Sequence, residues 1–453
     1  MRSMGRRLAL VLAALGFVSE AACTRTDILP APSTPAFDRT HAKAGAAVPR
    51  GLYHVMTGDY LTQESDLSNL SKYAPYLTYA YAPTNYLATL RKMGVRTLFY
   101  TNPLQPICTT FKASTCIRGD KVAFNYLRSE YKAAASRNCR GRLIHGSYRD
   151  YPVLQLNVNA SSATAYLQAV MDHLRAYVAA ENGGDVNAAS LYFVDNAVAN
   201  VYGTTSTECN QEPQQWEAQI ATDFRGITGG PFAINGLGAS SVAGVQQRLE
   251  AIRSPNVTMV LEENCYGGHG WNSEQPGNFV ADTTGHYTWL ASEYGEIRSI
   301  AMHKTFWCLN RLLGMGYRYP AWRLYTYASF LLSYEPHHAV YELDLATSSH
   351  LKVFPEMLFV PEEPAYTANE VSGYLQSSGV YLRRFRYCYY RGAYKGPCAV
   401  AVNPSPNATL QTPRGYTRHV ELKGGGVLDG GTLTLVKRVP HSMSPITAQI
   451  LLP

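Results

Sequence analysis

The sequence predicts an α/β protein: a (β/α)8 TIM barrel followed by a small C-terminal antiparallel β-sandwich domain. From residue 51 to about residue 345, short apolar β-rich runs alternate with amphipathic helical stretches, which indicates parallel strands joined by helices. Roughly eight such repeats over about 300 residues fit a barrel better than an open sheet. Beyond residue 370 the β runs are short and are broken by Gly and Pro, which favours antiparallel strands joined by turns.

The first 22 residues have the pattern of a signal peptide. Three arginines precede the apolar run 8–18, and this run is too short to cross a bilayer as a mature helix, which needs about 20 apolar residues. Residues 23–50 are rich in Pro, Ala and Thr. Such a composition buries too little apolar surface to offset the entropy lost on ordering, so we expect a disordered linker there.

Two processing outcomes are open after the apolar run. Ser19 and Ala21 fit the small-x-small pattern of ordinary cleavage, whereas Ala21–Ala22–Cys23 is similar to the end of a bacterial lipoprotein signal, with Glu20 where Leu is usual. Both outcomes predict an exported protein. It would be secreted, periplasmic, or anchored at the cell surface by attachment to the membrane through a lipid on Cys23.

We expect a TIM-barrel catalytic-like domain over residues 51–369 and an all-β domain over residues 370–453. The barrel strands are expected at 51–56, 95–102, 153–157, 190–195, 232–235, 258–262, 297–303 and 339–343. Helices are expected at 163–180 and 241–252, because apolar residues recur there every three or four positions. In the all-β domain the expected strands are 379–390, 398–403, 417–422, 432–436 and 447–452.

Cysteine usage agrees with export. Nine cysteines become eight once Cys23 is set aside, and an even number in an exported chain suggests disulfides. None of the spacings is C-x-x-C, so neither a zinc site nor a redox motif is expected. Eight cysteines allow 105 connectivities. Proximity in the sequence or around the barrel rim suggests the pairs Cys108–Cys116, Cys388–Cys398 and Cys209–Cys265.

The charge distribution bears on partners. The net charge of +7 includes the arginines of the expected signal peptide, and the remaining charges form no basic stripe, so no nucleic-acid partner is expected. The pair His337–His338 has no third ligand at a suitable spacing, so we expect no metal site. No glycine-rich phosphate-binding fingerprint follows the first expected strand, and no cofactor is expected.

Carboxylates end two of the expected barrel strands. Asp195 ends one apolar strand, and Glu262 and Glu263 end another two strands later. Active sites of barrels lie at the carboxyl ends of the strands, and a carboxylate buried there is costly unless it is hydrogen-bonded or reactive. Asp195 could instead cap the next helix, and a glutamate could pair with an arginine. Adjacent strand residues point to opposite faces, so only one glutamate should face the pocket, and we favour Glu263.

Further polar side chains near the expected strand ends could hydrogen-bond to sugar hydroxyls, although each could equally fasten a loop. The loop after the sixth expected strand also carries a histidine and a tryptophan, which is typical of a lid or a subsite loop. The candidate substrate-binding residues are Asp59, Asn102, Asn157, Asn196, Asn235, His269, Trp271 and His303.

Several segments resemble a known family, glycoside hydrolase-like family fifteen, a group of glycosidase-like TIM barrels with a C-terminal β-domain. The similar segments are 142–145, 153–157, 191–196, 327–332, 353–356, 384–385, 399–404 and 450–452, in the family's order, and the similarity covers most of residues 90–453. The resemblance implies that Asp195 takes the position of the family's catalytic aspartate. It leaves the partner acid open between Glu262 and Glu263, and it names no substrate.

The sequence therefore predicts an exported glycoside hydrolase-like protein that cleaves a polysaccharide by a two-carboxylate mechanism. Asp195 would act as nucleophile or base and Glu263 as general acid, with its pKa raised by burial. Its partner would be a polysaccharide or an oligosaccharide. The alternative is a non-catalytic carbohydrate-binding or matrix protein on a degenerate barrel, because a fold does not imply a function. A third reading is transglycosylation of the organism's own exopolysaccharide.

Overall fold

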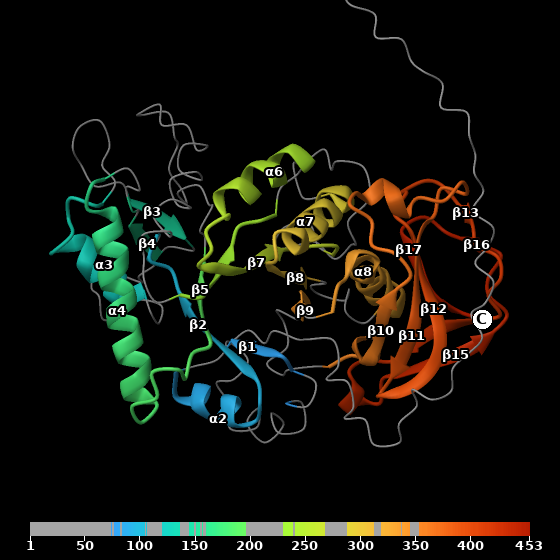
Figure 1. Ribbon diagram of the computed structural model, residues 1–453, viewed down its shortest axis with the longest axis horizontal. Helices are drawn as coiled ribbons and strands as arrows, with labels where there is room; N and C mark the ends of the chain where they lie inside the picture. Colours follow the sequence, from blue (N-terminus) through green and yellow to red (C-terminus); the bar gives the residue numbers. More distant parts are fainter. Residues whose placement is uncertain are drawn as a thin grey trace, which may run out of the picture. The chain divides into compact units, whose positions relative to one another are not determined.

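The computed structural model describes residues 74–453, except for 75–76, 82–83, 105, 107–119, 136–144, 149–150, 155, 157–159, 196–229, 239–240, 268–287, 312–318, 337 and 345–352. A seven-stranded parallel sheet is followed along the chain by a six-stranded antiparallel sheet (Figure 1). None of the described helices has both the length and the apolar character that a membrane span requires.

The parallel sheet has the strand order β1-β2-β5-β6-β7-β8-β9, and every neighbouring pair is parallel. Its strands are β1 (Tyr79–Tyr81), β2 (Arg96–Thr101), β5 (Leu191–Val194), β6 (Phe232–Asn235), β7 (Val257–Glu263), β8 (Thr305–Arg311) and β9 (Ala339–Asp344). Parallel neighbours need crossover connections, which helices commonly supply. The described helices of this part are η4 (Thr84–Tyr86), α2 (Leu87–Lys92), α3 (Asp120–Arg128), α4 (Ala163–Glu181), α6 (Val242–Ala251), α7 (Trp289–Ala301) and α8 (Pro320–Ser333).

Side chains along each parallel strand alternate between two packing layers, as the pleat requires. Phe232, Ile234 and Val260 face the helices and belong to the large core that α4, α6, α7 and α8 complete. The other face, here called the inner face, carries a separate apolar cluster that includes Phe193 and Trp307. This division decides which polar residues at the strand ends can meet.

The expected barrel architecture is observed in part. Seven parallel strands with covering helices fit an α/β barrel, whereas an eighth strand and a β9–β1 pair that would close it are not seen among the described residues. The expected first strand, 51–56, lies outside the described residues. The expected third strand, 153–157, is wrong as a barrel strand, because β4 (Tyr151–Leu154) pairs antiparallel with β3 (His145–Tyr148) in a separate hairpin.

The expected strand at 297–303 is also wrong, because α7 occupies most of this segment. The Thr288 hydroxyl accepts a hydrogen bond from the Ala291 backbone N–H at 3.2 Å and caps the start of this helix. Glu293 and Glu296 are fully buried on it, so its buried side lacks the apolar repeat by which a helix is recognised. The barrel strand in this part of the chain is β8, which follows α7 after a short turn.

The C-terminal sheet has the strand order β10-β11-β12-β17-β14-β15 and is antiparallel throughout, as expected. Its strands are β10 (Phe359–Pro364), β11 (Tyr381–Tyr390), β12 (Ala393–Asn403), β14 (Arg418–Lys423), β15 (Thr432–Lys437) and β17 (Thr447–Leu452), with the short 3-10 helices η9 (Pro355–Leu358), η10 (Val371–Tyr374) and η11 (Val427–Asp429). Because β10 begins at Phe359, this sheet starts before the expected domain boundary at residue 370.

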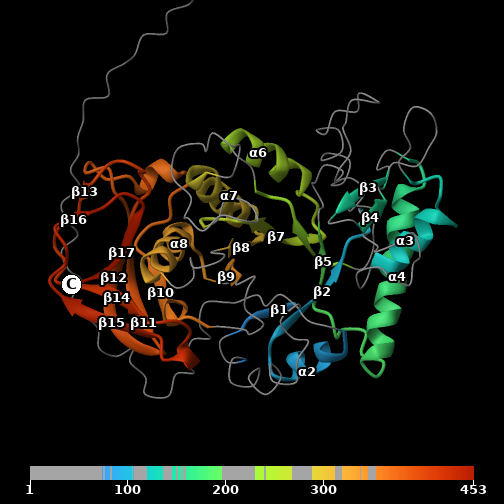
Figure 2. The same cartoon turned by 180° about the vertical axis from the view of Figure 1, so that it is seen from behind.

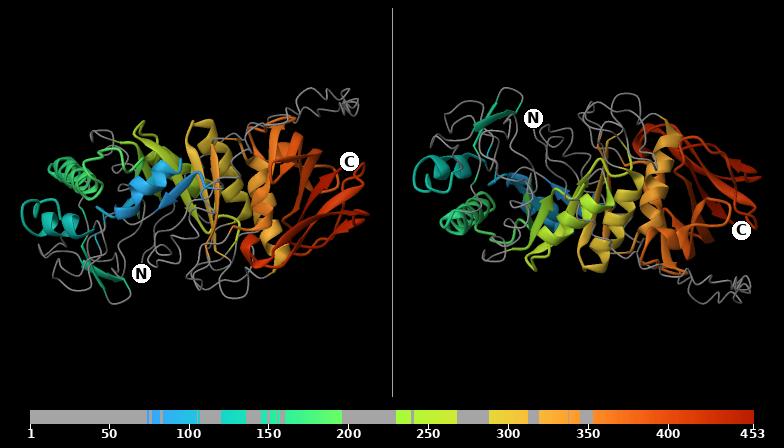
Figure 3. Two further views of the ribbon diagram at one scale, coloured as in Figure 1. Left: turned by 90° about the horizontal axis from the view of Figure 1, so that it is seen from below. Right: turned by 90° about the horizontal axis from the view of Figure 1, so that it is seen from above.

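The two faces of the C-terminal sheet pack against different elements. Val400 and Ile450 belong to the core shared with α8, which contacts β12 and β17. Ala401 and Leu451 point to the opposite face and pack against Met443, on the small sheet formed by β13 (Leu410–Gln411) and β16 (Ser442–Met443). Helix α8 therefore lies between the parallel and the antiparallel sheets (Figures 2 and 3).

Two buried arginines fasten the antiparallel sheet to the α8 region. Arg323 of α8 forms an ion pair with Glu356 at 2.9 Å, with both side chains at most 1 % exposed, and donates to the Gly424 carbonyl at 2.9 Å. Arg383 of β11 donates to the Tyr334 carbonyl, just after α8, at 2.5 Å. A buried charge without such partners would be strongly destabilising, so these contacts hold the two sheets and α8 in one packed unit.

Two disulfides are present among the described residues. Cys388–Cys398 joins β11 to β12, which confirms the expected local pair. The expected Cys209–Cys265 pair is wrong, because Cys265 is bonded to Cys308 with a Cα–Cα distance of 5.4 Å. Cys209 and the expected pair Cys108–Cys116 lie outside the described residues.

Candidate active site

Three neighbouring strands of the parallel sheet bring polar side chains together at their carboxyl ends. Asp195 directly follows β5, Asn235 is the last residue of β6, and Glu263 is the last residue of β7. Each lies two residues after an inner-face residue of its strand, namely Phe193, Ala233 and Leu261. The strand period of two therefore places all three on the inner face, at the end where barrel enzymes have their active sites.

Asn235 connects the two carboxylates. Its Nδ2 donates to Asp195 Oδ1 at 2.7 Å and to Glu263 Oε2 at 3.3 Å. Because both distances are measured from one nitrogen, these two carboxylate oxygens lie within about 6 Å of each other. Asp195 and Glu263 thus belong to one site, in which the amide of Asn235 supplies one N–H to each acid.

Tyr100, on β2, also contacts Asp195. Its hydroxyl donates to Asp195 Oδ2 at 2.9 Å. Burial raises the pKa of Tyr100 well above its usual value, and the negative charge of Asp195 raises it further, so the phenol stays protonated and remains a donor. Both Asp195 oxygens therefore accept a hydrogen bond, an arrangement that suits a group acting as a carboxylate.

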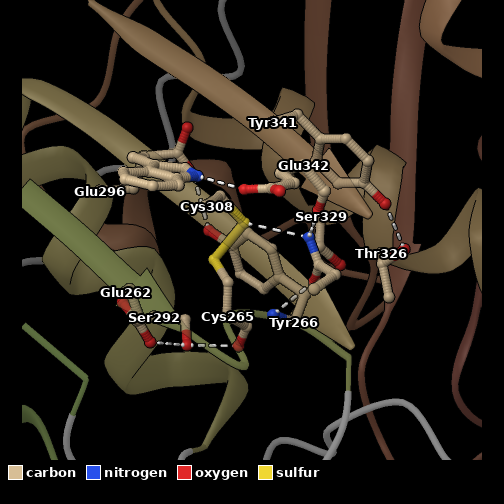
Figure 4. The surroundings of a disulfide bond; sticks show 12 residues. Glu262, Cys265, Tyr266, Ser292, Glu296, Cys308, Thr326, Ser329, Tyr341 and Glu342 are labelled. Carbon is tan, nitrogen blue, oxygen red and sulfur yellow. Dashed lines mark hydrogen bonds between the residues drawn. A yellow bond between two sulfur atoms is a disulfide. The ribbon is translucent and has the colours of Figure 1, made fainter. Parts of the chain in front are cut away.

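Glu262 is not part of this site, in contrast to its inclusion among the predicted catalytic residues. It is fully buried on the helix-facing side of β7, where the Ser292 hydroxyl oxygen of α7 lies 2.5 Å from its Oε1 and 2.7 Å from the Cys265 carbonyl oxygen (Figure 4). Its Oε2 faces Gly295, where an added Cβ would lie only 3.2 Å away. Burial raises the pKa of Glu262 from 4.5 to about 7, although the hydrogen bond from Ser292 opposes the shift.

A third carboxylate on the inner face was missed by the sequence prediction. Glu342 of β9 is 4 % exposed and accepts a hydrogen bond from Trp307 Nε1 at 2.8 Å. It is level with Glu263 along the sheet, since both pair in register with Leu309 of β8. Glu342 lies two residues after the inner-face residue Val340. This period of two is the sequence signal that could have placed Glu342 on the inner face. Figure 4 shows Glu342 and Glu262 on different sides of the Cys265–Cys308 disulfide.

Two of the other predicted substrate-binding residues lie in the described part of the chain. Asn102 directly follows β2 and is buried, and it is level with Asp195 because Thr101 pairs with Val194. Its backbone N–H donates to Asp120 Oδ1 at 3.0 Å. His303 does not end a strand, in contrast to the expected placement. It is exposed in the turn between α7 and β8, at the amino end of that strand, because the strand expected to end there is a helix. Five residues lie outside the described part: Asp59, Asn157, Asn196, His269 and Trp271.

Comparison with known proteins gives similar folds only. No protein-family model and no curated protein matches the chain, so the resemblance to family fifteen stays a prediction. Similar solved structures include the glycoside hydrolase domain of PelA from Pseudomonas aeruginosa, with 12% identity over 67% of this chain and 98% of that one, at a TM-score of 0.39.

Two other solved structures have similar folds. They are a GH31 family sulfoquinovosidase from E. rectale, with 9% identity over 89% of this chain and 62% of that one, at a TM-score of 0.44, and the maltogenic α-amylase AmyB from Thermotoga neapolitana, with 9% identity over 90% and 100%, at 0.36. The neighbours named here are glycosidases by their own descriptions. At such low identity and TM-score, they assign neither a family nor an activity to this chain.

Proposed function

We propose that this protein is an exported glycoside hydrolase in which Asp195 and Glu263 carry out the reaction. The single observation that carries the proposal is the hydrogen bonding of both carboxylates to one amide, Asn235, at the carboxyl ends of parallel strands. Hydrolysis of a glycosidic bond needs two carboxyl groups on either side of the bond, and such a pair is what this site offers.

The proposed chemistry assigns the carboxylate role to Asp195, because two donors contact its oxygens. Asp195 would attack the anomeric carbon while Glu263, as general acid, protonates the departing glycosidic oxygen. Glu263 would then take a proton from water, and that water would displace Asp195 from the sugar. Asn235 would position both acids throughout, and Tyr100 would hold Asp195 in place.

The spacing of the acids favours retention of configuration at the anomeric carbon. Retaining glycosidases have carboxyl groups about 5–5.5 Å apart, whereas inverting enzymes need about 6.5–9.5 Å to admit a water molecule. The two oxygens that accept from Asn235 lie at most about 6 Å apart, which is below the separation in inverting enzymes. We therefore assign the attacking role to Asp195 itself and not to an activated water.

The experiment is a comparison of Asp195→Asn, Glu263→Gln and Glu262→Gln in the full chain. Activity would first be sought with a panel of soluble bacterial and plant glycans, and reducing ends would then be measured on a glycan that the native protein cleaves. We expect kcat to fall by at least roughly 100-fold in the first two variants, as for loss of a nucleophile or a general acid. Glu262→Gln, the matched control, should remain active. Full activity of Asp195→Asn or Glu263→Gln would refute the proposal.

A non-catalytic carbohydrate-binding protein is the second candidate. The observation that favours it is the engagement of the acids with other groups of the protein: Tyr100 and Asn235 contact Asp195, and Asn235 also contacts Glu263. In that case a glycan would bind to the native protein without being cleaved. Asp195→Asn would then weaken binding, and no product would form with any member of the panel.

Export is part of the proposed function. The apolar run 8–18 and the two disulfides Cys265–Cys308 and Cys388–Cys398 support an oxidising compartment outside the cytoplasm. Mass spectrometry of the mature N-terminus would distinguish the two processing outcomes. A diacylglycerol-modified Cys23 would show a lipoprotein, and an unmodified N-terminus released by cleavage would show secretion. An intact Met1 in the mature protein would refute export by this signal.

A further inference from the structure

A cavity lies on the helix-facing side of the parallel sheet, on the side opposite to Asp195 and Glu263. It has a volume of about 640 Å³ and is bounded by η4, α3 and α4. This volume is within the range of about 300–1,000 Å³ in which small-molecule sites fall. The floor of the cavity contains Phe99 of β2 and Leu174 of α4, both buried. Phe99 faces away from the inner-face cluster, so the cavity is separated from the two acids by the sheet.

Aromatic rings from two helices border this cavity. Tyr177 of α4 is 43 % exposed, and its ring centroid is 6.4 Å from that of Phe99. On the α3 side, Tyr126 meets His173 of α4 edge-on, with centroids 6.2 Å apart. The cavity therefore combines a buried apolar floor with rings that are accessible from outside. Flat apolar rings beside water are suited to the C–H faces of pyranose sugars.

Polar groups complete the rim. Asn85, beside α2, and Asn125 and Lys121, on α3, line the cavity and are exposed. Within the described part of the chain, no hydrogen bond or ion pair engages the side chains of these three residues. Their amide and ammonium groups are therefore available to the hydroxyls or acetamides of a bound sugar. Lys121 and Glu181, the charged residues of the lining, are of opposite sign, which disfavours a polyanion as the ligand.

We propose that the cavity between α3 and α4 is a second glycan-binding site, which takes an uncharged oligosaccharide of hexose or N-acetylhexosamine residues and has no part in the chemistry. The choice of a carbohydrate rests on the proposed function, whereas the cavity and its lining do not. A polymer bound there would remain attached to the protein between successive cleavages at Asp195 and Glu263. The bound polymer would then have a high effective concentration near Asp195 and Glu263. This would raise the fraction of active sites that hold substrate, without any new contact to the two acids.

The test compares Tyr177→Ala with Tyr319→Ala. Both residues are tyrosines with similar exposure, 43 % and 46 %, but Tyr319 lies next to α8, outside the cavity, with its ring tilted against that of Trp322. Binding of cellohexaose, maltohexaose and chitohexaose would be measured by titration calorimetry in the full chain carrying Asp195→Asn, so that hydrolysis does not interfere. Near-ultraviolet circular dichroism would verify that each variant is folded.

We expect at least one hexaose to bind, with an association constant that Tyr177→Ala lowers roughly tenfold or more, because the buried apolar area of the ring is lost. Tyr177→Phe should restore binding, and Tyr319→Ala should leave it unchanged. Absence of binding by all three hexaoses, or equal binding by Tyr177→Ala, would overturn the proposal. These outcomes can be distinguished from failure of the proposed function. If the native protein cleaves a glycan but Tyr177→Ala binds the hexaoses as before, only the second site is refuted. If binding depends on the Tyr177 ring but no glycan is cleaved, only the proposed hydrolysis is refuted.

Discussion

Glu262 and Glu263 are neighbours in the sequence and lie on opposite faces of β7. Glu263 shares the inner face with Asp195, whereas Glu262 is sealed behind the strand by Ser292 and Gly295 of α7. Because side chains alternate between the two faces of a strand, the two glutamates have different surroundings. Glu263 is a partly exposed member of the candidate site, and Glu262 is a buried acid in the core.

Glu262 predicts a pH-dependent stability. Burial raises its pKa from 4.5 to about 7 in the folded protein, so the unfolded chain releases its proton at a lower pH than the folded protein does. The stability associated with Glu262 is therefore fully present below pH 4.5 and is lost as the pH rises to about 7, which amounts to about 3 kcal/mol. Burial raises the pKa values of Glu293 and Glu296 in the same direction.

The variant Glu262→Gln tests this prediction, because glutamine cannot ionise and can still bond to Ser292. Urea unfolding of both proteins would be measured at pH 4.5 and at about pH 8. Relative to the native protein, the variant should gain about 3 kcal/mol in unfolding free energy between the two pH values. A difference between the proteins that is the same at both pH values would contradict the assignment of this pH dependence to Glu262.

Tyr100→Phe should lower kcat without unfolding the protein. The change removes the hydroxyl that donates to Asp195 Oδ2 at 2.9 Å. A hydrogen bond to a charged group contributes about 1.5–3 kcal/mol, so kcat should fall roughly tenfold to a hundredfold. Tyr192→Phe is the matched control, because the Tyr192 hydroxyl is buried on the other side of the sheet and has no hydrogen-bond partner among the described residues. Equal effects of the two variants on kcat would argue against a role for Tyr100 at Asp195.

Much of the site was accessible from the sequence alone. Asp195 directly follows β5, and β6 and β7 end in Asn235 and Glu263. The general rule about carboxyl ends was sufficient to select these three residues. Strand alternation also predicted that only one glutamate faces the pocket. The sequence could not show that Asn235 contacts both acids, because that depends on the register between three strands that lie far apart along the chain.

Three errors around α7 have a common physical cause. The segment 297–303 has the short apolar run of a strand, but it belongs to a helix whose buried side carries Glu293 and Glu296. A periodicity test looks for apolar residues, so burial of glutamates conceals the helix. This error displaced the seventh expected strand, placed His303 at the wrong end of the sheet, and concealed β8 with its buried Trp307.

The two disulfides should contribute unequally to stability. Cys265–Cys308 closes a loop with a sequence separation of 43, and Cys388–Cys398 one with a separation of 10. A longer loop loses more entropy in the unfolded chain when it is cross-linked, which gives contributions of about 4 and about 3 kcal/mol. Thermal unfolding of the two double serine variants should therefore show the larger decrease in Tm for Cys265→Ser/Cys308→Ser. A larger decrease for the other pair would show that strain or residual structure outweighs loop entropy.

Chemical rescue should separate the roles of the two acids. Asp195→Ala removes the proposed nucleophile and leaves space for a small anion on the same face of the sugar. With an aryl glycoside of the cleaved sugar, sodium azide should restore turnover, because azide replaces the missing carboxylate as the nucleophile. Azide would attack the anomeric carbon directly, and the glycosyl azide should have the configuration opposite to that of the substrate, which proton NMR would determine.

The same experiment with Glu263→Ala should give the other stereochemical result. Asp195 is then still present and forms the covalent glycosyl-enzyme, and azide displaces Asp195 in a second inversion. The glycosyl azide should therefore keep the configuration of the substrate. If Asp195 only activated a water molecule, azide would attack directly in both variants and both products would be inverted. Retention in Glu263→Ala together with inversion in Asp195→Ala requires a covalent bond to Asp195, as the separation of at most about 6 Å from Glu263 predicts.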